Sequence, residues 1–96
     1  MGNHTAARQL AGMSAQDRIR EVAAGRATAA EVVKQARQVH GFYGIQHMAH
    51  PEALFDGAIP EGLRDAAEAV ASACRRCLEG LPAHAFFYAS RRLRRR

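Results

Sequence analysis

The chain has 96 residues, enough for one domain that folds alone, and carries 14 lysine and arginine side chains against 9 aspartate and glutamate side chains. No apolar run approaches the roughly 20 residues of a membrane span, and residues 1–14 lack a signal-peptide pattern, so we expect a cytoplasmic protein with reduced cysteines. The chain has 21 alanines but only 18 Leu, Ile, Val and Phe residues, which predicts good helices over a thin core that a partner or a second copy would help to stabilise.

Capping residues mark the first two predicted helices. We predict a flexible N-terminus over residues 1–13, followed by a helix over 14–24 that Ser14 and Asp17 begin and Gly25 ends. Thr28 and Glu31 then form a capping box for a second helix. This helix ends near Gly41 or Gly44, or it continues to Ala49 before Pro51. The apolar residues at helical spacing in these two helices are Ile19, Val22, Ala23, Val32, Val33, Ala36, Val39 and Tyr43.

The second half of the sequence predicts further helices and no strand. Pro51 favours the first position of a short helix over 52–56, and Pro60 opens the longest periodic stretch, about 60–79. Residues 83–93 fit a last helix. The fold class is therefore all-α, a small irregular bundle of four to five helices over 14–90 with a disordered basic tail over 91–96. The apolar face of the long stretch comprises Leu63, Ala67, Val70, Cys74, Cys77 and Leu81.

The basic tail accounts for the whole net charge of the chain, because residues 1–90 carry nine basic and nine acidic side chains. Clustered guanidinium groups suit the phosphates of nucleic acid, or another acidic surface. Phe86, Phe87 and Tyr88 lie just upstream, where they can stack on bases or pack in the core of the last helix. The alternative is that the tail only solubilises the protein. The tail arginines are Arg91, Arg92, Arg94, Arg95 and Arg96.

Histidines and cysteines form a second pattern. His40, Tyr43, His47 and His50 are spaced by 3, 4 and 3 residues, which places them in one stripe if the helix continues through the glycines. His47 and His50 together with Cys74 and Cys77 have the composition of a four-ligand zinc site. However, both cysteines fall on an apolar helix face, where Cys behaves as a small hydrophobic residue. A polar histidine face is the simpler interpretation, and we expect no cofactor.

Catalytic and sequence-specific DNA-binding motifs are not evident. The sequence has no nucleophile elbow and no glycine-rich phosphate loop, so we expect no enzyme activity. A helix-turn-helix register fails both at Gly12 and at Gly25. We therefore predict a small non-catalytic binding protein whose tail contacts nucleic acid or an acidic surface and whose helical body contacts itself or a partner. The alternatives are a protein-interaction module such as an adaptor or inhibitor, and, third, a metal-binding helical domain.

Overall fold

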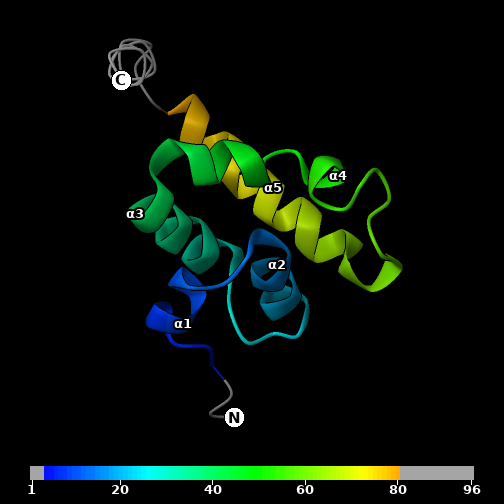
Figure 1. Ribbon diagram of the computed structural model, residues 1–96, viewed down its shortest axis with the longest axis horizontal. Coiled ribbons are helices and arrows are strands. Elements are labelled where there is room, and N and C mark those ends of the chain that lie inside the picture. The colour runs from blue at the N-terminus through cyan, green and yellow to red at the C-terminus, as the bar shows by residue number, and fades with distance from the viewer. Residues whose placement is uncertain (1–3, 81–96) are drawn as a thin grey trace.

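The computed structural model describes residues 4–80 and places five α-helices and one 3-10 turn in them, with no strand in that range (Figure 1). This confirms the all-α prediction. The predicted last helix over 83–93 lies outside the described residues. The elements are α1 (Ala7–Ala11), α2 (Ala15–Ala23), α3 (Ala29–Met48), α4 (Pro51–Leu54), the 3-10 turn η1 (Glu61–Leu63) and α5 (Arg64–Glu79).

The N-termini of α2 and α3 are formed by the predicted caps. The Ser14 hydroxyl accepts a hydrogen bond from the Asp17 amide at 3.1 Å. The Thr28 hydroxyl accepts one from the Glu31 amide at 3.1 Å, and the Glu31 carboxylate accepts one from the Thr28 amide at 2.8 Å. Each cap satisfies amides that have no partner inside the helix, so both helices begin where the sequence predicted.

The N-terminal segment contains a helix that the sequence did not reveal. The prediction of a flexible segment over residues 1–13 overlooked α1, whose Leu10 is buried in the core. A helix of five residues is too short to show apolar periodicity. Its C-terminal carbonyls are bound from another helix, since Arg18 on α2 donates from Nε to the Leu10 oxygen at 2.9 Å and from Nη2 to the Ala11 oxygen at 3.1 Å.

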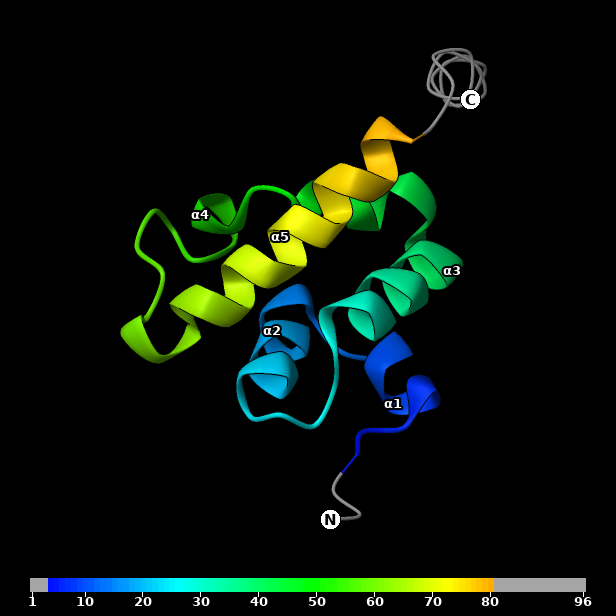
Figure 2. The same ribbon diagram turned by 180° about the vertical axis from the view of Figure 1, so that it is seen from behind.

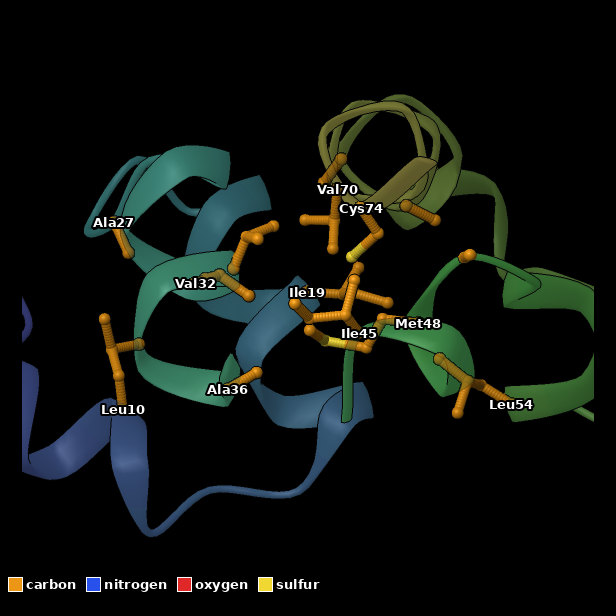
Figure 3. Close-up of a cluster of buried hydrophobic side chains, with 14 residues drawn as sticks. Leu10, Ile19, Ala27, Val32, Ala36, Ile45, Met48, Leu54, Val70 and Cys74 are labelled. Carbon is orange, nitrogen blue, oxygen red and sulfur yellow. The ribbon is translucent and has the colours of Figure 1, made fainter. Parts of the chain in front are cut away.

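The core lies between α2, α3 and α5, and the most extensive helix contact joins α3 to α5 (Figure 3). On α5 the predicted face is confirmed at Ala67, Val70 and Cys74, all fully buried, whereas Leu63 and Cys77 at its ends are half-buried. Leu81 lies outside the described residues. The other fully buried large side chains come from α1, α2 and α3: Leu10, Ile19, Val32, Ile45 and Met48.

Helix α3 is interrupted at Gly41, where the backbone has φ 62° and ψ −150°. The sequence left open whether the helix ends near this glycine or continues to Ala49; it does continue, but in two segments that run in different directions (Figures 1 and 2). The interruption also changes which side chains are buried. Val39 and Tyr43, predicted on the apolar face, are 49% and 64% exposed. For Tyr43 the reason is that the apolar face does not pass through Gly41 unbroken.

Gly41→Ala should lower the free energy of unfolding by about 1–3 kcal/mol, because residues with a Cβ rarely adopt this backbone conformation. Urea unfolding followed by far-ultraviolet circular dichroism measures the change. Gly62→Ala is the matched control, since Gly62 has open space around its Cβ position and no positive φ. Equal stability of the two variants would contradict the strained conformation assigned to Gly41.

Glu21 joins α2 to the segments on either side of it. Its carboxylate accepts hydrogen bonds from Arg26 Nε at 2.9 Å and Nη2 at 2.8 Å, and from the Thr5 hydroxyl. These bonds, that of Arg26 foremost, lower the pKa of Glu21 to about 2 from 4.5. The resulting stabilisation is present above pH 4.5 and is lost as the pH falls towards 2, because the carboxylate is protonated first in the unfolded chain.

Glu21→Gln should therefore lose less stability than the unchanged chain when the pH is lowered from about 6 to about 3. Urea unfolding midpoints at the two pH values measure the difference. Glu61→Gln is the matched control, since Glu61 is exposed and has no ion pair within residues 4–80. If Glu21→Gln lost as much stability on acidification as the unchanged chain, the role given to this carboxylate would be wrong.

Candidate functional site

A basic groove of about 550 Å³ lies between the first half of α3 and the last half of α5. Three of its lining residues are the exposed cations Lys34, Arg37 and Arg76, and none is a carboxylate. The groove therefore concentrates positive charge on a body whose charges balance overall. The complete lining is Ala30, Val33, Lys34, Arg37, Gln38, Ala73, Arg76 and Cys77.

The cations of the groove take part in no ion pair within residues 4–80. The arginines that do pair there are Arg20, Arg26 and Arg75. Arg37 is held by other contacts, since its guanidinium lies 5.3 Å from the centre of the Phe42 ring and its Nη1 donates to the Cys77 sulfur at 3.8 Å. A cation over an aromatic face keeps its full charge. The groove thus presents positive charge that no carboxylate neutralises.

Charge is distributed unevenly along α5. Residues 51–68, which include α4, η1 and the first turn of α5, contain five carboxylates and a single cation, Arg64. The far end of α5 contributes Arg76 to the basic groove. Counting charges in the sequence missed this arrangement, because the nine acidic and nine basic side chains of residues 1–90 cancel in the total. The carboxylates at the acidic end are Glu52, Asp56, Glu61, Asp65 and Glu68.

The predicted histidine stripe does come together, although α3 is not straight. His40, Tyr43 and His47 of α3 and His50, the residue before α4, all line one cavity of about 910 Å³. We call this cavity the histidine pocket. Its other wall is the turn between α1 and α2, which includes Ser14, together with Arg18 of α2.

The cysteines lie elsewhere, so the four-ligand composition is not assembled. Cys74 is fully buried in the core and Cys77 lines the basic groove, whereas His47 and His50 line the histidine pocket. Within residues 4–80 no group of three or more His, Cys, Asp or Glu side chains has an arrangement that could hold a metal ion. The physical reason is that the histidines face the α1–α2 turn, whereas the cysteines face α3 and the core.

Arg18 lines this pocket too, and sequence reasoning did not identify it as a site residue. Arg18 is only 3% exposed, and this burial lowers the pKa of its guanidinium. It forms no ion pair within the described part of the chain, where its two hydrogen bonds go to carbonyl oxygens of α1. The only signal in the sequence is that Arg18 directly precedes Ile19, which helical periodicity places in the core.

The predicted binding residues of the tail, Arg91, Arg92, Arg94, Arg95 and Arg96, lie outside the described residues, as do Phe86, Phe87 and Tyr88. Searches found no matching family model, no similar curated protein and no similar solved structure. In residues 4–80 no helix has both the length and the apolar character needed to cross a membrane.

The two free cysteines should differ in reactivity. Burial raises the pKa of the Cys74 thiol to about 11, whereas Cys77 is half-buried at the basic groove. Because the thiolate is the reactive form, iodoacetamide should modify Cys77 in the folded protein and leave Cys74 unmodified until the chain unfolds. Peptide mass spectrometry after timed alkylation measures this. Equal modification of both cysteines in the native protein would place Cys74 outside the core.

Proposed function

We propose that this protein is a non-catalytic nucleic-acid-binding protein that contacts phosphates through the basic groove and through Arg91, Arg92, Arg94, Arg95 and Arg96. The observation that carries the proposal is the groove itself: Lys34, Arg37 and Arg76 line it without any carboxylate. Guanidinium and ammonium groups on one surface are suited to the closely spaced phosphates of a nucleic-acid backbone.

The tail follows the groove closely in the sequence. Arg76 and Cys77 line the groove close to the end of α5 at Glu79, and ten residues, 81–90, separate Gly80 from Arg91. Ten residues span at most roughly 36 Å when fully extended. The proposal therefore allows the tail arginines and the groove to contact the same nucleic acid, in which case the short connection raises their effective concentration there.

The acidic end of the body supports the same proposal. The carboxylates of residues 51–68 repel phosphates, so a nucleic acid that approaches the protein is directed towards the opposite end of α5. Neutrality of the whole body therefore does not argue against binding. The groove and tail provide affinity through backbone phosphates, and this kind of contact alone carries no base preference.

A protein-interaction module is the second candidate, because Val39 and Tyr43 expose apolar surface on α3 at 49% and 64%. Such a surface would bind a partner with little dependence on salt, since burial of apolar area is not screened by ions. Salt dependence therefore distinguishes the two functions in one experiment.

Fluorescence anisotropy of labelled duplex and single-stranded oligonucleotides across a salt series tests the proposal on the full chain. The double variant Lys34→Ala with Arg76→Ala should reduce the slope of log affinity against log salt on duplex DNA by about 1.8, at about 0.9 per phosphate contact. Deletion of residues 91–96 should reduce the same slope by up to about 4.5, since it removes five arginines. Absence of salt-dependent binding by the full chain would overturn the proposal.

The matched control is the double variant Arg8→Ala with Arg64→Ala. It removes two exposed arginines that lie outside the groove and have no ion pair within residues 4–80, so the change in net charge is the same. Its slope should stay close to that of the unchanged chain. Equal slopes for the two double variants would mean that net charge, not the groove, determines binding.

Cys77 gives a second, independent measure of groove occupancy. Because it lines the groove beside Arg76, bound nucleic acid should slow its alkylation by iodoacetamide in proportion to the bound fraction. An unchanged rate at saturation would show that nucleic acid binds elsewhere on the protein.

A further inference from the structure

The histidine pocket has the composition of a site for a small anion with an apolar body. Its volume of about 910 Å³ falls within the range of small-molecule sites. Its lining residues include one permanent cation, Arg18, and no carboxylate. The remainder are three histidines and apolar or neutral side chains: Ala11, Gly12, Met13, Ser14, Ala15, Tyr43, Gly44, Gln46 and Ala53.

Two nitrogens of the Arg18 guanidinium donate hydrogen bonds that hold the group in place, and the third, Nη1, is available to a ligand. Nε and Nη2 donate to the carbonyl oxygens of Leu10 and Ala11, whereas Nη1 donates to no acceptor in the described part of the chain. Among those residues no side-chain nitrogen is both buried and without a hydrogen-bond partner. Nη1 is therefore accessible to solvent. Because Arg18 lines the histidine pocket, we infer that Nη1 is accessible from this pocket.

A buried charge without a counterion is unusual, because transfer of an ion out of water is unfavourable unless an opposite charge compensates for it. Carbonyl dipoles of α1 compensate for part of the Arg18 charge, but no carboxylate approaches it within residues 4–80. Ser14, the N-cap of α2, and Ala15, its first residue, also line the pocket, and the positive end of the helix dipole there adds to the attraction for an anion.

We propose that the histidine pocket binds a small organic anion, a carboxylate or a phosphate on an aromatic or similarly apolar body. The anionic oxygens accept hydrogen bonds from Arg18 Nη1, and the apolar body lies against Tyr43 and Met13, which line the same cavity. Such a charge-assisted hydrogen bond is about twice as strong as a neutral one. This site shares no lining residue with the basic groove, so the inference does not depend on the proposed nucleic-acid function.

Nuclear magnetic resonance titration of the full chain tests the site with naphthoate, naphthyl phosphate and the uncharged naphthamide. Gly12 and Gly44 line the pocket, so their backbone amide signals should shift on addition of naphthoate or naphthyl phosphate. Naphthamide should bind at least about tenfold more weakly, because it lacks the charge that Arg18 recognises. Whichever of the two anions binds more tightly shows whether the pocket prefers a carboxylate or a phosphate. Equal affinity for naphthoate and naphthamide would overturn the proposal, as would inorganic phosphate that binds as tightly as naphthyl phosphate.

Two variants locate the binding. Arg18→Met should reduce the affinity for naphthoate by at least about tenfold and leave that for naphthamide unchanged. Because Arg18 also holds α1, a second variant is needed that keeps this arginine: Ala53→Trp fills the pocket from its rim and should reduce naphthoate binding by about tenfold or more. Ala69→Trp, an exposed alanine of α5 outside the pocket, is the matched control. Equal affinity of the two Trp variants would overturn the assignment.

Discussion

Gly41 interrupts α3 with a backbone conformation, φ 62° and ψ −150°, that residues with a Cβ rarely adopt. The relative orientation of the two halves of the helix depends on this conformation. Ala36 and Ile45 are nine residues apart, or two and a half helical turns, so they would lie on opposite sides of a straight helix. Both are fully buried in the same core. Tyr43 and His47, by contrast, lie about two and three turns after Ala36 and would share its side of a straight helix. The interruption turns Ile45 into the core (Figure 3). Tyr43 and His47 remain accessible to solvent.

This division of α3 separates two surfaces of different chemistry. Before Gly41 the helix packs its apolar residues on α5 and leaves Lys34 and Arg37 at the basic groove. After Gly41 it directs His47 to a pocket whose opposite wall contains the buried Arg18. Neither surface has a carboxylate among its lining residues, and five of the nine acidic side chains of the chain fall within residues 51–68. Under the two proposals, the basic groove binds a nucleic-acid backbone and the histidine pocket binds a small organic anion, although residues 1–90 carry no net charge.

The sequence predicted those parts of the fold that local chemistry decides. Ser14 and Thr28 begin their helices as caps, and the spacing of Ala67, Val70 and Cys74 gave the buried face of α5. It did not predict α1, because the carbonyls of Leu10 and Ala11 are bound by Arg18 from the next helix. It wrongly placed Tyr43 in the core, because helical periodicity assumes an unbroken axis, and it wrongly placed Val39 there as well. For the candidate sites, the histidine stripe was visible in the spacing. The basic groove was not, because Lys34 and Arg76 are distant in sequence and meet only through the packing of α3 on α5.

The orientation of the second half of α3 is measured most directly by nuclear Overhauser effects among assigned side chains. The interrupted helix predicts cross-peaks from the methyl groups of Ile45 and Met48 to those of Ile19 and Val70, which belong to the same core. It predicts none from the ring protons of Tyr43, which is 64% exposed, to those core methyl groups. If the Tyr43 ring contacted the Ile19 and Val70 methyl groups and Ile45 gave no such contacts, α3 would be a straight helix. Both the histidine pocket and its separation from the basic groove would then be wrong.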